Sequence, residues 1–436
     1  MDHEQLVIFI PPERQGEYFT IPFAMPENVA SMTLSYHYPT HISDSNQTDL
    51  GVFHAKERLN IIDLGLFNPD GKQVGVSGSD KDTITISESS ATTGYSPTPL
   101  TPGEWQILVG AYQVAPQGVT VTYEMDFISK QCQLLIGDIH THTTASDGVL
   151  TLPELAAHAK RHDLDFLAIT DHNHMAQSNI LNQIEGITLI PGVEWTHYQG
   201  HANFLGVDQP YDPPFYSNTT PDALKRFALA RERGALIVVN HPCDDTCPFT
   251  FNLETFPFDC IEIWNGPMRE SNLKAIALWQ KLLESGKQIP AVGGSDYHKD
   301  HLFQILGGPC MGVYALSNCP KDILDAIQFG HSYICFAPEG PSIQLTAAHM
   351  IMGDKLPWKE GQTVSILAKA LKANDVLRVI HNQESMNIFQ APSDGDVELS
   401  YPVSSPGFVR VEIYRTFIPG LPPLPALISN PIYFTK

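Results

Sequence analysis

The chain has 436 residues, which is too long for one ordinary domain and long enough for three. Charged residues make up 17 % and hydrophobic residues 42 %, a composition that excludes a disordered chain. The 48 acidic and 26 basic residues give a formal net charge of -22. This charge disfavours nucleic acids and anionic membrane surfaces as partners, because both are bound mainly through Lys and Arg.

Neither a secretion signal nor a membrane-spanning helix is expected. Residues 1–13 lack the basic start of a signal peptide, and no apolar run reaches the length of about 18 residues that spans a bilayer. The seven cysteines are odd in number and mostly lie in apolar runs, which favours free thiols in a cytoplasmic protein. Cys243 and Cys247 are interpreted as loop cysteines in preference to a structural zinc site or a disulfide.

Residues 1–130 have the pattern of a β domain. Short alternating or apolar runs such as LVIFI, MTLSYHY and VTVTYEMDF are separated by turn signals, among them Pro69-Asp70-Gly71. No helical periodicity of useful length occurs in this segment. The sequence therefore predicts an N-terminal antiparallel β-sandwich.

Residues 131–338 alternate between strands and helices. Thr151 is expected to cap a helix whose first turn contains Pro153 and Glu154, and further helices are predicted near 221–233, 272–285 and 321–329. About seven apolar runs lie between these helices, which favours parallel strands joined by helical crossovers. Residues 339–436 return to a β pattern and are predicted to form a second antiparallel β-sandwich.

The apolar runs of the middle segment end in residue types that bind metal ions. These endings are DIHTH at 138–142, TDH at 170–172, GVE at 192–194, NHP at 240–242 and GSDYH at 294–298. His140 and His142 alternate on a strand end, so their imidazoles point the same way and are able to chelate one divalent ion. Parallel strands of a barrel end on one rim, and the sequence therefore predicts one metal-binding cavity there.

In this order the motifs resemble the PHP family, the polymerase and histidinol phosphatase metallohydrolases, over residues 131–338. The resemblance implies a distorted seven-stranded β/α barrel of the TIM type, flanked here by the two β-sandwiches. It also implies two or three divalent ions, commonly zinc, manganese or iron. The metal ligands that it implies are His140, His142, Asp147, His172, Glu194, His201, His241, Asp296 and His298.

The resemblance also groups these ligands. His140 and His142 would bind the first ion with Asp296 and Glu194, and Glu194 would bridge to a second ion. His201 and His241 would complete the second position, and Asp147, His172 and His298 would form the third. Two alternatives stay open: His197 could replace His201, and Asp147 stands where some family members have histidine.

Several further residues near these motifs are candidates for roles beside the ligands. Asp296 and His298 are expected to help move protons, and Arg269 to contact a phosphate, with an exposed surface arginine as the alternative. Asp138 either orients a ligand imidazole or is a solvated strand-end carboxylate. Glu262 is expected in a buried salt bridge rather than in catalysis.

The function that follows is a metal-dependent phosphoesterase acting on a small anionic mono- or diester. Such ions lower the pKa of a bound water, supply a hydroxide nucleophile and neutralise charge on the phosphoryl group. A closer likeness to the carbaryl-hydrolase-like branch of the family (CehA/McbA) makes a carbamate, carboxyl-ester or amide substrate the alternative. A non-catalytic scaffold is the alternative of another class, and the flanking domains are expected to cover the barrel, shape the pocket or form a homo-oligomer contact.

Overall fold

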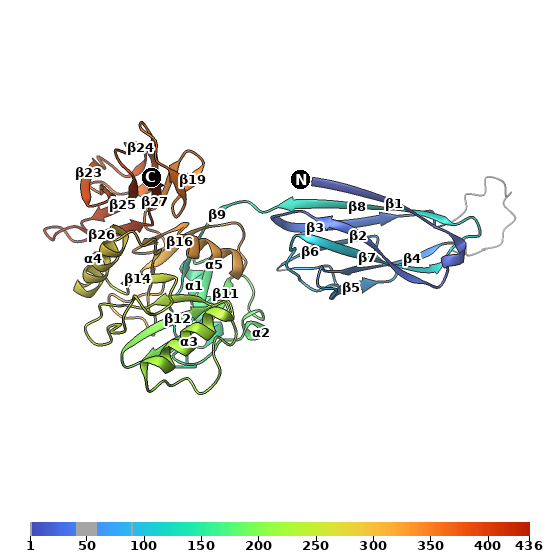
Figure 1. The fold of residues 1–436 in the computed structure, drawn as a ribbon, viewed down its shortest axis with the longest axis horizontal. Coiled ribbons are helices and arrows are strands. Elements are labelled where there is room, and N and C mark those ends of the chain that lie inside the picture. The colour runs from blue at the N-terminus through green and yellow to red at the C-terminus, as the bar shows by residue number, and fades with distance from the viewer. Residues whose placement is uncertain (1, 41–58, 89) are drawn as a thin grey trace. The chain divides into compact units, whose positions relative to one another are not determined.

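The computed structural model describes residues 2–40, 59–88 and 90–436. The chain divides into two compact units, Met1–Gln131 and Cys132–Lys436, each with its own core. Figure 1 shows the first unit mainly as strands, with one short 3-10 helix η1 (Pro12–Arg14) in the structure, and the second as strands and helices. Among the described residues, no helix is both long and apolar enough to span a membrane.

The first unit consists of two four-stranded antiparallel sheets. Their strand orders are β1-β8-β3-β6 and β2-β7-β4-β5. The strands are β1 (Asp2–Ile10), β2 (Tyr18–Met25), β3 (Val29–His37), β4 (Ile61–Phe67), β5 (Gln73–Ser77), β6 (Thr83–Ser87), β7 (Gly103–Gln113) and β8 (Val119–Ser129). Alternate residues of β7 and β8 are buried, and Trp105 and Tyr123 belong to one hydrophobic cluster that both sheets share.

The second unit begins with the segment in which strands and helices alternate. Its elements are β9 (Gln133–Asp138), α1 (Leu152–Arg161), β10 (Phe166–Ile169), α2 (Ser178–Leu181), β11 (Thr188–His197), β12 (Gly200–Leu205), α3 (Thr220–Glu232), β13 (Leu236–Val239), β14 (Cys260–Asn265), α4 (Glu270–Glu284), β15 (Ala291–Gly294), β16 (Cys310–Ala315), α5 (Pro320–Phe329) and β17 (Ser332–Cys335). As predicted, the Glu154 carboxylate accepts hydrogen bonds from the N–H and the hydroxyl of Thr151 where α1 begins.

The predicted closed barrel of parallel strands is wrong. This part of the large sheet runs in the order β15-β14-β13-β12-β11-β10-β9-β16-β17, and among the described strands no pairing of β15 with β16 or β17 closes it. Within these nine strands, the parallel pairings are those of β9-β10-β11 and β13-β14-β15. The turn between β11 and β12 is too short for a helical crossover, so β12 returns antiparallel, a strand that the sequence analysis missed. Gly200 closes this turn at φ 146°, where a Cβ would clash with Phe249.

A second reason for the open sheet lies between β15 and β16. The described residues show no backbone pairing between these two strands, and the N–H of Gly293 in β15 donates to the sulfur of Met311 in β16 at 3.2 Å. Helices α3, α4 and α5 pack on the sheet through buried Phe227, Trp279 and Ile323. The strand ends that carry the candidate ligands are therefore fixed by a continuous hydrophobic core.

The C-terminal strands belong to the same compact unit as these elements, although residues 339–436 were expected as a separate domain. They are β18 (Ser342–Ala347), β19 (Met350–Ile351), β20 (Lys355–Pro357), β21 (Thr363–Leu371), β22 (Val376–His381), β23 (Glu384–Gln390), β24 (Gly395–Pro402), β25 (Gly407–Arg415), β26 (Leu424–Ser429) and β27 (Ile432–Thr435). β26 pairs with β17 and continues the large sheet, whereas β19-β18-β21-β24 form a separate four-stranded sheet. The buried Asn430 amide bonds to Ala291 and Ser332, which ties the two parts together.

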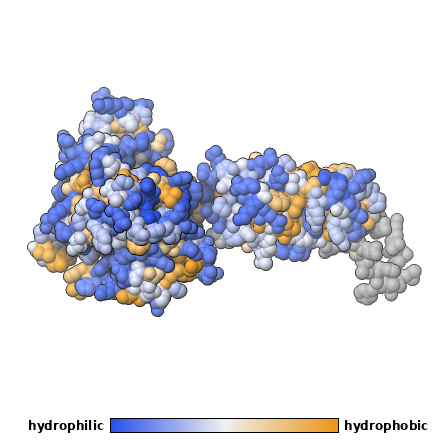
Figure 2. Space-filling view, turned by 60° about the horizontal axis from the view of Figure 1, so that its bottom comes forward, coloured by the Kyte–Doolittle hydropathy of each residue, from blue (hydrophilic) through white to orange (hydrophobic). Residues whose placement is uncertain are grey.

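The surface of the described residues mixes polar and apolar side chains. The face drawn in Figure 2 is mostly hydrophilic, with hydrophobic patches spread over it. Exposed large apolar residues occur in both units, for example Phe9 and Tyr112 in the first and Leu302 and Phe303 in the second. Single exposed residues of this kind are normal in folded proteins.

Candidate metal centre

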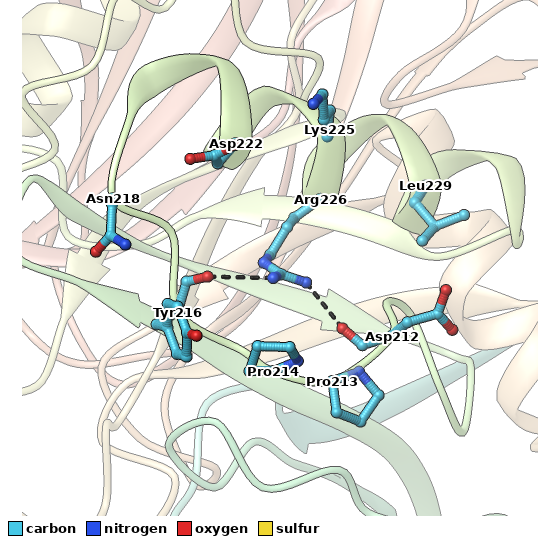
Figure 3. Close-up of a pocket in the computed structure, with 9 residues that line it drawn as sticks. All are labelled: Asp212, Pro213, Pro214, Tyr216, Asn218, Asp222, Lys225, Arg226 and Leu229. Carbon is cyan, nitrogen blue, oxygen red and sulfur yellow. Dashed lines mark hydrogen bonds between the residues drawn. The ribbon is translucent and has the colours of Figure 1, made fainter.

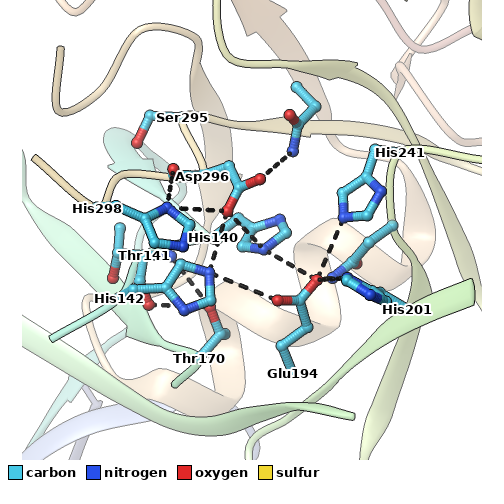
Figure 4. Close-up of polar contacts among 12 residues, drawn as sticks. His140, Thr141, His142, Thr170, Glu194, His201, His241, Ser295, Asp296 and His298 are labelled. Carbon is cyan, nitrogen blue, oxygen red and sulfur yellow. Dashed lines mark hydrogen bonds and ion pairs between the residues drawn. The ribbon is translucent and has the colours of Figure 1, made fainter. Parts of the chain in front are cut away.

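The candidate ligands labelled in Figure 4 come together from the segments that follow β9, β13 and β15, from within β11 and from the start of β12. These ligands are His140, His142, Glu194, His201, His241, Asp296 and His298. All nine residues that the resemblance named belong to groups whose ligand atoms lie within 4.8 Å of one another. Glu194 on β11 lies at the middle of the centre and is fully buried. Its neighbours come from segments more than 100 residues apart, so the fold and not the local sequence forms the site.

One oxygen of Glu194 faces three imidazoles. Glu194 Oε1 lies 3.3 Å from His140 Nε2, 3.1 Å from His201 Nδ1 and 3.3 Å from His241 Nε2. The amide of Asn240 also donates to this oxygen at 2.9 Å. This side of Glu194 corresponds to the second position of the resemblance.

The other oxygen of Glu194 faces the first and third positions. Glu194 Oε2 lies 2.8 Å from His172 Nδ1 and 3.5 Å from His142 Nε2. Asp296 Oδ1 lies 3.0 Å from His142 Nε2 and 3.3 Å from His140 Nε2. The carboxylates of Glu194 and Asp296 and the imidazoles of His140 and His142 thus form one compact group, in which Asp296 has a left-handed backbone with φ 51°.

The third group is more open to solvent. Asp147 Oδ1 lies 3.2 Å from His298 Nε2 and 4.0 Å from His142 Nδ1, and Asp147 Oδ2 lies 3.7 Å from His172 Nε2. The side chain of Asp147 is 58 % exposed, against 27 % for His298 and 26 % for His172. His172 contacts both Asp147 and Glu194 Oε2, so it connects the third group with the Oε2 side of Glu194.

His197, the alternative to His201, faces away from the centre. Its Nε2 lies 3.0 Å from the carbonyl of Ser217, and its ring stacks on Trp195 at 5.2 Å. His201 is in the next strand and contacts Glu194 directly. The hairpin β11–β12 therefore selects His201, because successive residues of a strand alternate between the two faces. His201 is opposite Thr196, which shares the face of Glu194, whereas His197 lies on the other face.

The electrostatics of the centre favour bound cations. His140 Nε2 and Glu194 Oε2 are buried and have no hydrogen-bond partner among the described residues, although charged groups lie within ion-pair distance. Burial acts to raise the pKa of Glu194, but His140 and His172 outweigh it and hold this pKa well below its ordinary range. Burial acts to lower the pKa of His140, yet Asp296, Glu262 and Glu194 raise it well above its ordinary value.

These two directions have one cause, which is the close packing of carboxylates and imidazoles of opposite charge, because each group stabilises the charged form of the other. Nitrogen and carboxylate oxygen donors are the ligand types that zinc, iron and manganese accept. The residues present thus fit two or three divalent ions, and cations at these positions would satisfy the two unpartnered atoms.

Glu262 supports the ligands from outside the centre. The buried carboxylate lies 3.0 Å from His140 Nδ1 and accepts the backbone N–H of His241 at 2.8 Å. The Asn265 amide donates to it at 3.2 Å and to Asp296 Oδ2 at 3.3 Å. Glu262 thus makes the predicted buried contact, and through it fixes the orientation of a ligand imidazole.

Asp138 does not orient an imidazole, and neither sequence interpretation of it holds. This fully buried carboxylate accepts the N–H groups of His140 at 3.2 Å, Ser295 at 3.1 Å and Gly307 at 3.0 Å, together with the Ser295 hydroxyl. Burial raises the pKa of Asp138 to about 6, against the lowering effect of these hydrogen bonds. Asp138 therefore holds the backbones of the segments that carry His140 and Asp296.

Two residues that support the ligands, Asn240 and Asn203, were not predicted from the sequence, because asparagine is not a typical metal ligand. Asn240 precedes His241 and donates to Glu194. The amide of Asn203 donates to the carbonyl of Ile139 at 3.2 Å. Asn240 also donates to Asn203 Oδ1 at 2.9 Å. The sequence feature that could have indicated these two residues is a polar amide within, or directly after, an apolar strand run.

Arg269 lies beside the centre rather than in it. Its guanidinium donates to Asn265 Oδ1 at 3.0 Å and pairs with Asp244 Oδ2 at 3.0 Å, and the side chain is 47 % exposed. Because Asn265 contacts Asp296, Arg269 is two contacts away from a candidate ligand. Arg269 is therefore exposed, as in the second sequence interpretation, and its contact with a phosphate stays a prediction.

Cys243 and Cys247 are free thiols in the loop after β13. Cys247 Sγ lies 3.8 Å from His241 Nδ1 and groups with His201 and His241 as a set that could hold an ion. Cys243 packs against the hydrophobic cluster. The interpretation as loop cysteines near the site agrees with these positions.

A separate hollow of about 440 Å³ lies beside the start of α3 and is lined by Asp212, Pro213, Pro214, Tyr216, Asn218, Asp222, Lys225, Arg226 and Leu229 (Figure 3). Arg226 donates to the carbonyls of Asp212 and Tyr216 at 2.8 and 3.1 Å. These bonds use the guanidinium to hold the loop before α3. None of the candidate ligands lines this hollow.

Comparison with curated proteins finds similarity to ribonucleases over part of the chain. The 5'-3' exoribonucleases Rnm of Salmonella typhimurium and Escherichia coli are 36 % identical over 110 residues, 23 % of this chain and 38 % of each relative. A 5'-3' exoribonuclease of Haemophilus influenzae is 42 % identical over 69 residues, 15 % of this chain and 25 % of that protein. The chain thus spans less than half the length of these relatives. No protein-family model matches the sequence.

Several solved structures are similar at low identity. A two-domain protein of Bacteroides vulgatus, described as containing a PHP-like metal-dependent phosphoesterase, is 19 % identical with a TM-score of 0.42 over 68 % of this chain and 95 % of its own. A protein of Bifidobacterium adolescentis described as a metal-dependent phosphoesterase has 17 % identity and a TM-score of 0.31, over 39 % of this chain and 90 % of its own. An amidohydrolase of Chromobacterium violaceum has 17 % identity and a TM-score of 0.28, over 37 % and 87 %.

The curated relatives share one class of chemistry, since all of them are exoribonucleases and therefore hydrolases. The prediction that this chain is an enzyme of the hydrolase class agrees with this similarity.

Proposed function

We propose that this protein is a metal-dependent phosphoesterase that hydrolyses a small phosphate mono- or diester with two or three divalent ions. The observation that carries the proposal is the convergence of nine ligand-type side chains on Glu194, with His140 Nε2 and Glu194 Oε2 left without hydrogen-bond partners. A purely structural cluster would satisfy such buried atoms within the protein. Bound cations would act as partners for these two atoms and would allow the centre to catalyse hydrolysis.

Ions held at these positions would polarise the phosphoryl group, neutralise its charge and lower the pKa of a water molecule. The protein would supply the geometry. Glu194 would be able to hold ions on both of its sides, because its two oxygens face different groups of imidazoles. Asn265 and Glu262 keep Asp296 and His140 in place through hydrogen bonds.

Asp296 and His298 remain the candidates for moving protons. His298 Nδ1 lies 2.8 Å from the carbonyl of Asp296, so this nitrogen carries the proton and leaves Nε2 as the basic atom on the side of Asp147. A group that also binds an ion is a weaker base, so proton transfer by His298 requires an outer position that exchanges its ion readily.

Arg269 is proposed to contact the substrate phosphate. Its guanidinium is half exposed, and its partner Asp244 has a low exposure of 12 %. Burial acts to raise the pKa of Asp244, but hydrogen bonds from Thr246 and Cys247 and the charge of Arg269 lower it to about 2. Asp244 therefore stays ionised and holds Arg269 at the edge of the centre, where it could form a bidentate contact with an anion.

Two other substrates compete with a small phosphate ester. The carbaryl-hydrolase-like resemblance points to a carbamate, carboxyl ester or amide, and the same centre would polarise a carbonyl group. Similarity to exoribonucleases makes a short oligonucleotide worth testing, although the formal net charge of -22 opposes a long nucleic acid. A scaffold without catalytic activity would leave the centre without stoichiometric ions.

The deciding experiment combines metal analysis of the purified protein with hydrolysis assays before and after chelation. The substrates are p-nitrophenyl phosphate, bis-p-nitrophenyl phosphate, a dinucleotide and 1-naphthyl N-methylcarbamate. We expect at least two ions per chain and phosphate-ester cleavage that chelation abolishes and added metal restores. Cleavage of the carbamate alone would contradict the phosphoesterase proposal, and absence of both ions and turnover would contradict an enzyme.

A further inference from the structure

The imidazole of His241 has a different partner on each nitrogen. Nε2 faces the centre, 3.3 Å from Glu194 Oε1, whereas Nδ1 faces outward, 3.8 Å from Cys247 Sγ. His140 has the same arrangement, with Nε2 towards the centre and Nδ1 3.0 Å from Glu262. An imidazole that binds an ion through one nitrogen carries its proton on the other and donates it to an acceptor behind it. The sulfur of Cys247 thus lies next to Nδ1 of His241, as the carboxylate of Glu262 lies next to Nδ1 of His140.

The loop holds Cys247 in this orientation. Asp244 Oδ1 accepts the N–H of Cys247 at 3.2 Å and lies 3.5 Å from its sulfur, so the thiol proton points to Asp244. Asp244 also accepts the N–H and the hydroxyl of Thr246 at 2.8 and 2.7 Å and pairs with Arg269. With its proton directed to Asp244, the sulfur presents its lone pairs to the N–H of His241.

We propose that Cys247 is the positioning residue of the second metal position, where its sulfur accepts the Nδ1 proton of His241 and keeps Nε2 available to an ion. This inference rests on the proposed metal centre and adds a residue that is not itself a ligand. Sulfur is a weaker acceptor than the carboxylate that supports His140. The second position therefore binds its ion less tightly than the first.

Metal titration of the full chain tests the proposal. After removal of ions, Zn²⁺ is added in competition with a chromophoric chelator, and the affinity of each position is measured. Replacement Cys247→Ala should weaken one position by about tenfold to a hundredfold and leave another unchanged. Cys247→Ser, which keeps an acceptor and a donor, should retain much of the affinity.

The matched control is Cys243→Ala in the same loop, since Cys243 packs against the hydrophobic cluster and contacts no candidate ligand among the described residues. It should bind zinc as the natural chain does. Unchanged affinities in Cys247→Ala, or an equal loss in Cys243→Ala, would overturn the proposal. Circular dichroism and thermal unfolding of the metal-free variants check that each one folds.

Cobalt spectroscopy separates positioning from direct ligation. The Co²⁺-loaded natural chain should show visible bands from nitrogen and oxygen ligands and no sulfur-to-cobalt charge-transfer band. A charge-transfer band that Cys247→Ser removes would show that the thiolate binds the ion, and would overturn a positioning role. These readouts need no catalytic turnover, so a centre that binds ions without phosphoesterase activity would refute the proposed function and leave the role of Cys247 intact.

Discussion

The metal centre has two regions that differ in burial. The inner region consists of His140, His142, Glu194, His201, His241 and Asp296, and the outer region of Asp147, His172 and His298. The side chains of His140 and Glu194 are 0 % and 1 % exposed, whereas that of Asp147 is 58 % exposed. The inner ligands are held by Glu262, Asn240 and Asn265, whereas the exposed Asp147 contacts outer and inner imidazoles at 3.2 to 4.0 Å.

This difference in burial predicts that the two regions bind ions with different affinity. Buried charges that cannot be hydrated need cations for balance, so the inner region should bind ions tightly. An exposed carboxylate is stabilised by water and gains less from an ion. The outer region should therefore exchange its ion readily and adapt to the substrate, and the following changes test that contrast.

The largest effect is expected for Glu194→Gln. The amide has the shape of the carboxylate but no charge, so both inner positions lose a charged ligand and the negative charge that balances buried cations. Activity should fall by at least about a hundredfold, together with loss of the inner ions in metal analysis. Glu232→Gln, at the exposed end of α3, is the control and should behave like the natural chain. Full activity in Glu194→Gln would rule out a metal-based mechanism.

A smaller and more selective effect is expected for Asp147→Asn. Only the outer position loses a charged ligand, because Asp147 lies 3.2 Å from His298 but does not contact Glu194. Metal analysis should find one ion fewer per chain, with the inner ions retained and activity reduced by roughly tenfold. Loss of every ion would show that the two regions bind cooperatively and that burial does not separate them.

A still smaller effect is expected for Asn240→Ala, which leaves every ligand in place. The variant removes the hydrogen bond of 2.9 Å that fixes Glu194 Oε1. Affinity for the inner ions should fall by about tenfold, with little change at the outer position. Asn179→Ala, an exposed position on α2, is the control. Competition titration measures the ion affinities of both variants. Equal affinities in the two variants would show that Asn240 does not help to hold Glu194 for ion binding.

The sequence was sufficient to predict which ligands come together because their signal is local. Each candidate ligand is a His, Asp or Glu beside an apolar run, and neighbouring strands bring such ends to one edge. The pattern also predicted α1, α3, α4 and α5, since their capping residues and apolar spacing are local as well. Resemblance to a known family then grouped the ligands.

Features that depend on contacts between distant segments were beyond prediction. The insertion of β12 and the missing backbone pairing of β15 with β16 keep the sheet open, and neither has a marker in the sequence. The positions of Asp138 and Asn240 are of the same kind. Their partners lie 157 and 46 residues away, and carboxylates or amides in apolar runs fit many roles.

The smallest effect is expected for His158→Ala on α1, which tests whether the centre depends on the helix behind it. His158 Nε2 lies 3.3 Å from Asp300 Oδ1, and the centre of its ring is 5.7 Å from that of Tyr297. In the sequence, Tyr297 stands between the candidate ligands Asp296 and His298. The backbone carbonyl of Tyr297 accepts the N–H of His142 at 2.9 Å, so the main chain fixes this segment without help from His158.

We therefore expect an unchanged metal content for His158→Ala, kcat/KM within about twofold, and a loss of unfolding free energy of about 1 kcal/mol. Steady-state kinetics and thermal unfolding measure these quantities. A large loss of activity with intact ions would mean that the ring of His158 holds Tyr297 against the outer ligands. In that case the outer ligands would be held rigidly despite their exposure to solvent. The two regions would then differ in their affinity for ions and not in how firmly their ligands are held.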